Sequence, residues 1–449
     1  MRRTRRSGWL ALLLVLGWGA GPRALEVWPP EHRPGTWAAS LPTGHPLRMQ
    51  GLHFPGGQGA FERVYARMDS LLLTGTGSLQ VVHMGGSHVQ AGWMSDQIRQ
   101  RWEALAPGTQ PDRGLVLPHR LVRTNGPARV ELTGSEGWTG ARCGVRQHAG
   151  PFGATGIRAE TSDTNARWVQ WTTRPDGRCF ATNRVTMYGT SVGMEPAWDG
   201  PSHLPSPVRT PHPTGWRFDF ASPTDTLWFR WETIPPDTSG LPPAPPPSAA
   251  LHGWRCEDTR GDARFVYHDI GNNGAATGSY LRDAGTPSFL AQWTDLAPDL
   301  VVFGIGINDA HGPADSFDAA AFEARYDSLI SGIRAARPSV AFLFLTNTDS
   351  RFNGRPNRAA FAVREAMFRL AARHGAAVFD LFDAMGGLGS FRRWQSLDWA
   401  QDDGVHLNAA GYRIVGNLLF DAWLDAWGRH AHPDFRKRYF IPEPIAPRP

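Results

Sequence analysis

Two segments of the chain carry residues that suit serine-based acyl transfer. Ser87 follows Gly85-Gly86 at the end of an apolar run. A serine in such a turn is either a nucleophile or the N-cap of the next helix. His406 comes three residues after Asp403, a spacing that lets a carboxylate hold one imidazole nitrogen while the other accepts a proton from serine. The simpler interpretation is a capping aspartate beside a surface histidine.

Two further segments carry groups that stabilise negative charge. Asn308, in the run GIND, offers a side-chain N–H to an oxyanion, or it belongs to a plain Asn-Asp turn. Gly274, in the run GNNGA, lets a backbone N–H approach a bound substrate, although a turn is the commoner use of such a glycine.

The elements around these residues alternate between strands and helices. Expected strands are 79–84, 264–269, 300–305, 340–345 and 377–382, and expected helices are 59–73, 89–105, 318–336, 358–374 and 409–427. This order predicts an α/β domain with a mostly parallel sheet covered on both faces. Ligands of such sheets bind beyond the carboxyl ends of the strands, where all four candidate segments stand.

The middle of the chain has a different texture. Between 125 and 262, short alternating segments such as TLWFRWET are separated by Gly, Pro, Asp and Asn. They predict a β-sandwich module inserted into the α/β domain. All three cysteines, Cys143, Cys179 and Cys256, lie there, and one disulfide is expected without an indication of which pair forms it.

The amino end has the features of an export signal. Four arginines precede the short apolar core WLALLLVLGW, which small and turn residues follow up to Ala24. This order predicts a signal peptide over 1–24 and a periplasmic or secreted protein. A membrane anchor is the alternative, but the core is shorter than a bilayer span. No stable membrane span is expected in the mature protein.

Charge and motifs exclude other classes. The formal net charge is +5 and 19% of residues are charged. No basic cluster interleaved with aromatics suggests nucleic-acid binding, so no nucleic-acid partner is expected. Motifs for a zinc protease, a P-loop or a dinucleotide site are missing from the sequence, and no metal or organic cofactor is expected.

The joint order of Ser87, Gly274, Asn308 and Asp403-x-x-His406 resembles the SGNH (GDSL-type) hydrolase family. The stretches HMGGSHVQAG, YHDIGNNGA, APDLVVFGIGIND and DGVHLNAAGY are similar to a bacterial envelope branch of peptidoglycan O-acetylesterases, some of which carry an inserted β-module. The resemblance implies a three-layer α/β/α, flavodoxin-like domain. The change in texture sets its expected bounds at 25–124 and 263–449, with a carbohydrate-binding-like β-module inserted at 125–262.

The same resemblance implies the roles of the site residues. Ser87 is expected as nucleophile, His406 as base and Asp403 as its orienting partner. The Ser87 N–H, the Gly274 N–H and the Asn308 side chain are expected to form the oxyanion hole. One departure is Gly86, because the first block of the family usually reads Gly-Asp-Ser.

Other residues near the four matching segments are given structural roles or are left open. His83 and His88 are interpreted as structural, because one base suffices. Gln90 and Arg99 either line the pocket or cover a helix face. The tryptophans of the module, among them Trp138, Trp168, Trp171 and Trp198, are expected mostly in its core rather than stacked on sugar rings.

The expected function is the removal of O-acetyl groups from an extracytoplasmic polysaccharide. Peptidoglycan is the preferred candidate substrate, and the reaction is expected to pass through an acetyl-enzyme intermediate. An O-acetyltransferase would use the same triad with a sugar hydroxyl in place of water. A glycan-binding protein with a degenerate hydrolase domain is the third interpretation, motivated by Gly86 and the aromatic module.

Overall fold

The computed structural model describes residues 35–106, 109–174, 176–235 and 245–431. At its centre is a six-stranded sheet with the order β19-β16-β15-β1-β14-β2, in which every neighbouring pair is parallel. The strands are β1 Gly77–Gly85, β2 Gln110–Asp112, β14 Ala263–Gly271, β15 Leu300–Gly304, β16 Ala341–Leu345 and β19 Ala377–Phe379. Without the edge strand β2 this is the flavodoxin-like order 2-1-3-4-5, which confirms the expected fold class.

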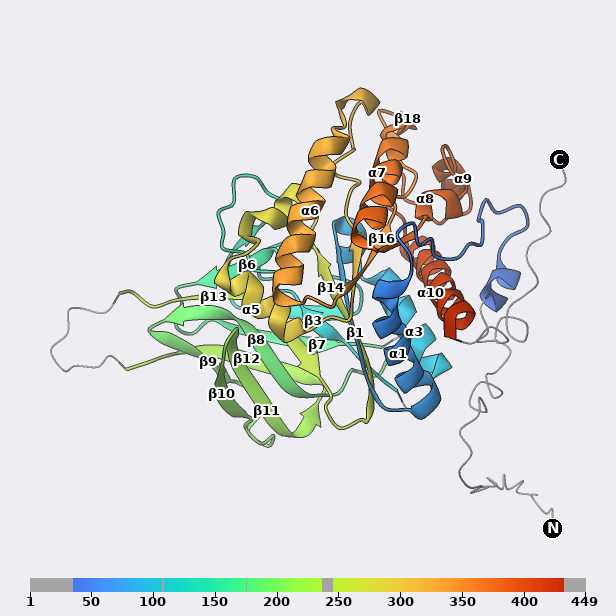
Figure 1. Cartoon of the computed structure of the whole chain (residues 1–449). Coiled ribbons are helices and arrows are strands. Elements are labelled where there is room, and N and C mark those ends of the chain that lie inside the picture. Colours follow the sequence, from blue (N-terminus) through green and yellow to red (C-terminus); the bar gives the residue numbers. More distant parts are fainter. Residues whose placement is uncertain (1–34, 107–108, 175, 236–244, 432–449) are drawn as a thin grey trace, which may run out of the picture.

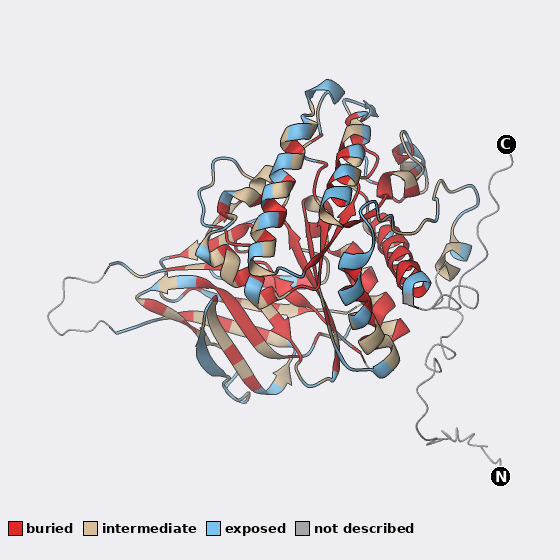
Figure 2. Ribbon diagram, viewed as in Figure 1, coloured by how far each residue is buried: buried red, intermediate tan, exposed pale blue. Residues whose placement is uncertain are grey.

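Helices cover both faces of this sheet, and Figure 1 shows the resulting layers. One face carries α1 Glu62–Asp69, α3 Trp93–Leu105 and α10 Ala409–Ala431; the other carries α5 Pro287–Leu296, α6 Ala319–Ala336 and α7 Ala359–His374. In β15, Leu300 and Val302 join the first core while Val301 and Phe303 join the second. A strand that is apolar at every position is therefore explained by a sheet buried on both sides, as Figure 2 shows.

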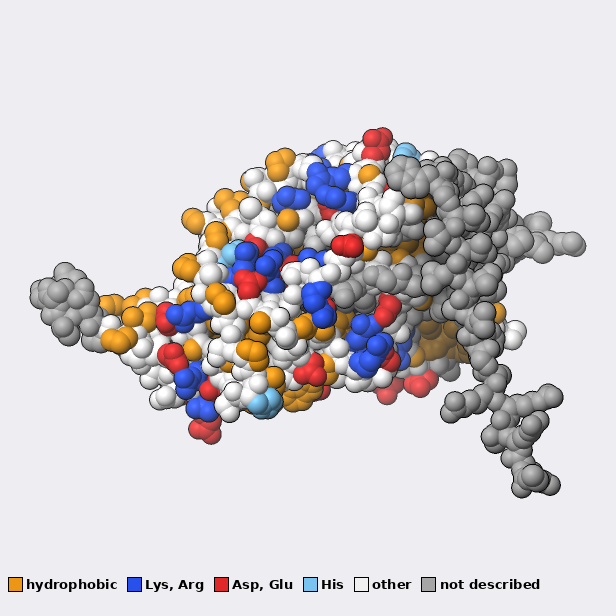
Figure 3. Space-filling view, turned by 90° about the horizontal axis from the view of Figure 1, so that it is seen from below, with side chains coloured by type: hydrophobic (Ala, Val, Ile, Leu, Met, Phe, Trp, Pro, Cys, Tyr) orange, Lys and Arg blue, Asp and Glu red, His pale blue; other side chains and the backbone are white. Residues whose placement is uncertain are grey.

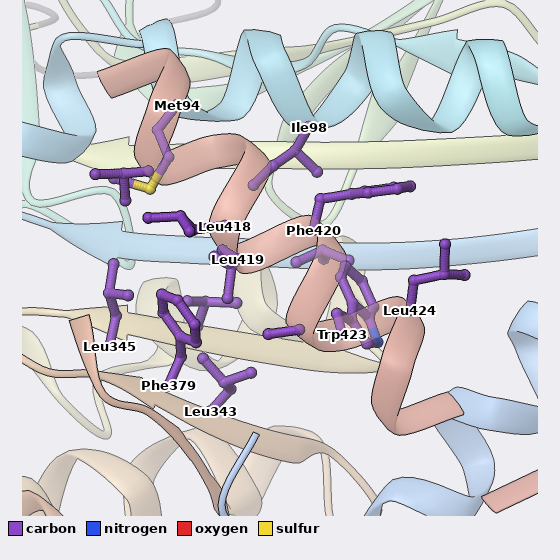
Figure 4. Packing of buried hydrophobic residues seen from close by; sticks show 14 of the residues in the cluster. Met94, Ile98, Leu343, Leu345, Phe379, Leu418, Leu419, Phe420, Trp423 and Leu424 are labelled. Carbon is purple, nitrogen blue, oxygen red and sulfur yellow. The ribbon is translucent and has the colours of Figure 1, made fainter. Parts of the chain in front are cut away.

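The first face is packed by long aliphatic and aromatic side chains. In Figure 4, Met94 and Ile98 of α3 lie beside Leu418 and Phe420 of α10, in front of one face of the sheet. Each such side chain contributes about 1.5–3 kcal/mol when fully buried. This packing holds α10 firmly against the sheet, and α10 begins three residues after His406.

The segment after β1 is not the single helix expected over 89–105. It forms the short helix α2 Ser87–Gln90 and then α3, with Gly92 at φ 74° between them. A Cβ at Gly92 would lie 2.9 Å from Cβ of Pro127, so both the conformation and the space require glycine. The break gives Ser87 its own turn of helix, separate from the long helix that packs in the core.

The remaining elements of the α/β domain are short. They are α4 Thr277–Tyr280, α8 Leu381–Ala384, α9 Phe391–Ser396 and the hairpin of β17 Arg351–Phe352 and β18 Arg355–Pro356. The helix expected over 59–73 consists of α1 followed by one π-helical stretch, Ser70–Thr74.

Two antiparallel sheets form the β-module, as expected for a sandwich. The larger sheet holds β3 Gly114–Val116, β5 Thr139–Arg142, β6 Ile157–Thr161, β8 Thr182–Val192, β10 Val208–His212, β11 Gly215–Thr224 and β13 Ser248–Glu257. The smaller sheet holds β4 Val130–Gly134, β7 Arg167–Thr172, β9 Met194–Trp198 and β12 Thr226–Thr233. Trp138 and Trp168 lie in the core between them, whereas Trp171 and Trp198 are half-buried. The boundaries 125 and 262 stay a prediction.

The expected disulfide does not form. Cys143, Cys179 and Cys256 are all free thiols in the described structure. Cys143 packs into the core shared with α5 and α6, while Cys256 packs into the core of the module. Burial in separate cores keeps these two apart, and Cys179 is only partly buried elsewhere on the module.

The expected signal peptide at 1–24 lies outside the described residues. Within the described ranges, no helix has the length and apolar character needed to cross a membrane.

Candidate active site

The side chains of Ser87, His406 and Asp403 form one hydrogen-bonded chain. Ser87 Oγ lies 2.7 Å from Nε2 of His406, and His406 Nδ1 lies 2.6 Å from a carboxylate oxygen of Asp403. Ser87 begins α2 at the carboxyl end of β1, and the other two residues lie on the loop before α10. The arrangement allows the imidazole to take the serine proton while the carboxylate holds the ring and favours its charged form.

The loop that carries the aspartate also fixes its direction. The other oxygen of Asp403 accepts hydrogen bonds from the backbone N–H groups of Val405 and His406, each at 2.9 Å. Partial burial works against the charged carboxylate, but these N–H donors and the imidazole outweigh it, and the pKa of Asp403 falls below its ordinary value. The Asp403 carboxylate is therefore ionised and can balance the positive charge of a protonated His406 ring.

Hydrogen-bond donors stand beside the serine. The side-chain amide of Asn308 donates to the carbonyl of Ala275 at 2.9 Å, which leaves its second N–H for another acceptor. Among the described residues, neither the Ser87 N–H nor the Gly274 N–H has a hydrogen-bond acceptor. Both belong to the walls of one pocket with Asn308 and His406. Such a set suits an oxyanion that forms next to Ser87.

The glycine named for this role lies on the pocket, unlike its neighbour Gly271. A Cβ at Gly271 would come within 2.2 Å of the Gln90 backbone nitrogen, so Gly271 lies tightly beneath α2. Gly274 has open space around it, because a Cβ added there would lie 3.9 Å from its nearest contact outside the adjacent residues, the carbonyl oxygen of Gly144.

The pocket itself is open and is lined mainly by residues with polar side chains. Besides the groups above, its walls include Gln90, Asn125, Asn273, His311 and Gln401. Gln90 holds two of these walls together, because its amide donates to the Asn125 carbonyl at 2.5 Å and accepts from the Asn273 N–H at 2.6 Å. Gln90 is therefore a pocket residue.

Arg99 lies elsewhere. Its guanidinium is buried against β14, where it pairs with Asp269 at 3.0 Å. Of the two residues whose placement the sequence left open, Gln90 lines the pocket and Arg99 belongs to a buried ion cluster.

The histidines that flank Ser87 differ in their contacts. His83 is fully buried and its Nδ1 lies 3.0 Å from the Tyr267 hydroxyl, which fits a structural role. His88 stacks on the ring of His406, with centroids 5.3 Å apart and planes 28° apart. Burial, with a smaller contribution from the nearby His406 charge, lowers the pKa of His88 to about 3, so this ring presents a neutral face to His406.

Several pocket residues were not named from the sequence. His311 comes three residues after Asn308 and packs edge-on against Phe352. Asn125 stands where the sequence changes texture. Two features of the sequence could have indicated these pocket residues. Asn125 lies beside a predicted domain boundary, and His311 follows the end of a predicted strand.

Comparison with models of known families finds a similarity over part of this chain. The model of the GDSL-like lipase/acylhydrolase family matches residues 244–414, a span that contains Gly274, Asn308, Asp403 and His406 but begins after Ser87. A comparison with curated protein sequences finds no match.

One solved structure extends the likeness over most of the chain. The structure of a peptidoglycan O-acetylesterase superposes with a TM-score of 0.67 at 20% identity, covering 85% of this chain and 99% of that one. An acetyl xylan esterase covers 35% of this chain and 80% of its own, at 20% identity and a TM-score of 0.28. The first of these likenesses shows a shared fold that includes the inserted β-module.

Proposed function

We propose that this chain, a carboxylic ester hydrolase with a GDSL-like lipase/acylhydrolase domain, removes O-acetyl groups from an extracytoplasmic polysaccharide, with peptidoglycan as its foremost substrate. The observation that carries the proposal is the continuous contact from Ser87 Oγ through His406 to Asp403, beside the free N–H groups of Gly274 and Ser87. It supports roles for Ser87 as nucleophile, His406 as base and Asp403 as the partner that orients it.

The reaction follows from these contacts. His406 Nε2 takes the Ser87 proton as Oγ attacks the acetyl carbonyl carbon, and the carbonyl oxygen becomes an oxyanion among the Ser87 N–H, the Gly274 N–H and the Asn308 amide. The C–O bond to the sugar breaks, and the sugar oxygen leaves with the proton from His406. Water, deprotonated by His406, then attacks the acetyl-serine and releases acetate and free Ser87.

The walls of the pocket favour a small acyl group on a polar alcohol. Several amide side chains and backbone groups surround Ser87, and among the described residues the apolar side chains in the walls are Ala91, Val405 and Tyr412. A long acyl chain would require a deep apolar channel, whereas hydroxyl-rich sugars pair well with amides. The fold shared with a peptidoglycan O-acetylesterase and the export signal expected over 1–24 support a cell-wall substrate outside the cytoplasm.

Acetate release from O-acetylated peptidoglycan tests the proposal. The parent protein should release acetate, and Ser87→Ala should lose at least about a thousandfold in rate, because the nucleophile is removed. Ser328→Ala, an exposed serine that bonds only within α6, serves as the control and should match the parent.

Other outcomes lead to different conclusions. Turnover of 4-nitrophenyl acetate without acetate release from peptidoglycan would keep the esterase and reject this substrate. Acetyl groups that appear on an added saccharide, in place of free acetate, would make the enzyme a transferase. Undiminished release by Ser87→Ala would reject the assigned nucleophile.

A further inference from the structure

A second hollow adjoins the candidate active site at the loop 272–276 between β14 and α4, which carries Gly274 and is called the oxyanion loop below. Gly274 lines both, and the second hollow also receives Arg146 from the β-module and Arg282 and Arg325 from the α/β domain. It lies where the two parts of the chain meet, because Gly144 of the module packs against the backbone of Asn273 and Ala275.

The charges in this hollow are not balanced. Three guanidinium groups share one carboxylate, that of Asp309, which lies 3.7 Å from Arg325. That carboxylate is almost fully buried and also accepts hydrogen bonds from the N–H and hydroxyl of Thr277. It is therefore already used, and it neutralises at most one of the three cations.

The two other arginines lack a carboxylate partner among the described residues. Arg282 donates to the backbone carbonyls of Cys143, Val145 and His148, which hold its guanidinium in place without cancelling its charge. Its guanidinium also lies 4.7 Å from the ring of Phe152. Arg146 is exposed and, within the described ranges, makes no hydrogen bond or ion pair. One cation is thus preorganised and one is free to close on a ligand.

We propose that this hollow is a subsite for a carboxylate carried by the acetylated glycan. The inference rests on the proposed function and adds the substrate class: an acetylated saccharide with an acidic substituent near the ester. A guanidinium matches a carboxylate with paired hydrogen bonds, and such charge-assisted bonds are stronger than neutral ones. Because Gly274 borders both hollows, an anion held here would place the neighbouring acetyl group at Ser87.

Arg146 is the residue with which to test the subsite. Arg282 and Arg325 also support the loop structure, whereas Arg146 has no such contact. With O-acetylated peptidoglycan, Arg146→Glu should raise KM about 5- to 20-fold and leave kcat within twofold, since the contact binds substrate without touching the reacting atoms. Arg146→Lys should restore much of the parent KM. Arg260→Ala, in the turn at the opposite end of β14, is the control and should behave as the parent.

The substrate is varied as well as the protein. When the carboxylates of the same peptidoglycan are converted to amides, the parent should show the raised KM, and Arg146→Glu should no longer differ from it. Turnover of 4-nitrophenyl acetate, which has no carboxylate, should be equal in all four proteins. Equal KM values for the parent and Arg146→Glu on the untreated polymer would overturn the subsite.

A competition experiment separates failure of the subsite from failure of the proposed function. N-acetylmuramyl-L-alanyl-D-glutamate, which carries free carboxylates on its peptide as the polymer does, should inhibit 4-nitrophenyl acetate hydrolysis by the parent at least fivefold better than its amide, and Arg146→Glu should lose this preference. The result holds whether or not peptidoglycan is hydrolysed. Equal inhibition by acid and amide would reject the subsite even if acetate release succeeds.

Discussion

At the scale of single residues, the space around Gly86 accounts for the departure from the Gly-Asp-Ser pattern before Ser87, the proposed nucleophile. A Cβ at residue 86 would lie 2.9 Å from the amide nitrogen of Asn308, closer than side chains tolerate. The Asn308 amide, which is proposed to bind the oxyanion, therefore occupies the space that a side chain at residue 86 would need.

Gly86→Ala should consequently lower kcat, because the added methyl displaces Asn308. The expected loss on 4-nitrophenyl acetate is about 10- to 100-fold, approaching the effect of removing one oxyanion donor. Gly59→Ala, where a Cβ meets nothing within 4 Å, is the matched control. A Gly86→Ala enzyme as active as the parent would show that the Asn308 amide is not needed where it lies.

The ring of His88 leads to a second prediction at this scale. The His88 ring stacks on the His406 ring and also meets Tyr412 edge-on, so it limits rotation of the His406 imidazole. His88→Ala should lower kcat about tenfold through misplacement of the imidazole, while His88→Phe, which keeps a flat ring, should stay near the parent.

The pH profile distinguishes this positioning role from proton transfer. Since the pKa of His88 is lowered to about 3, its ring is neutral throughout pH 5–9 and no charge is lost in His88→Phe. The ratio of parent to His88→Phe rates should be constant over that range. A ratio that changes with pH would mean that His88 itself carries a proton in the reaction.

At the scale of elements, a buried ion cluster joins α3 to the end of β14. Asp269 lies 3.0 Å from Arg99 and 2.9 Å from Arg113, and it accepts a hydrogen bond from Ser95 at 2.8 Å. Burial opposes the charged form, but the two arginines outweigh it, and the pKa of Asp269 is lowered. The cluster positions the strand whose carboxyl end carries the Gly274 loop.

Asp269→Asn should destabilise the protein by about 3–5 kcal/mol near pH 7, because two buried cations lose their counter-charge. A carboxyl with a lowered folded pKa contributes stability above its unfolded pKa of about 3.9 and loses it as the pH falls through the folded value. The gap in unfolding free energy between parent and variant should thus narrow below about pH 4. Asp176→Asn, which breaks an exposed pair with Arg178, is the control. A gap that does not change with pH would show that Asp269 is uncharged in the folded protein.

The predicted elements and the observed ones agree where a local pattern determines them. β15, α6 and α7 begin and end within about a residue of their predicted bounds, since each is a continuous apolar run or a clear helical period. The break at Gly92 was missed because it depends on Pro127, a contact between segments. The assignments of Ser87, Asn308 and His406 needed the order of all four segments, as no single segment was specific. The stacking of His88 and the burial of Arg99 depend on tertiary contacts that no local pattern contains.

At the scale of the whole molecule, the β-module and the α/β domain are built as neighbours with shared contacts. Tyr188 of β8 donates to Asp295 of α5 at 2.6 Å, and β13 runs into β14 after a short turn. On the face in Figure 3, acidic and basic side chains are interspersed rather than gathered into one stripe. The arginine hollow between the two parts, by contrast, holds three guanidinium groups and one carboxylate.

The β-module should also affect kcat, through its contact with the loop that carries Gly274. A Cβ at Gly144 would lie 2.8 Å from the Asn273 carbonyl oxygen and 3.0 Å from the Ala275 nitrogen, both backbone atoms of the loop that carries Gly274. Gly144→Ala should therefore shift the Gly274 N–H and lower kcat on 4-nitrophenyl acetate about tenfold, an effect comparable to a small misplacement of a catalytic group.

The control and the assay temperature make that prediction specific. Gly332→Ala on α6, where a Cβ would be 3.5 Å from its nearest neighbour, should retain the parent kcat. Rates measured at least 15 °C below the midpoint of each thermal transition remove the contribution of unfolding. If Gly144→Ala lowers the midpoint but leaves kcat unchanged, the module only stabilises the fold. A loss of kcat at an unchanged midpoint would mean that the inserted module helps to shape the oxyanion loop, which ties an insertion in the sequence to the chemistry of the domain that contains it.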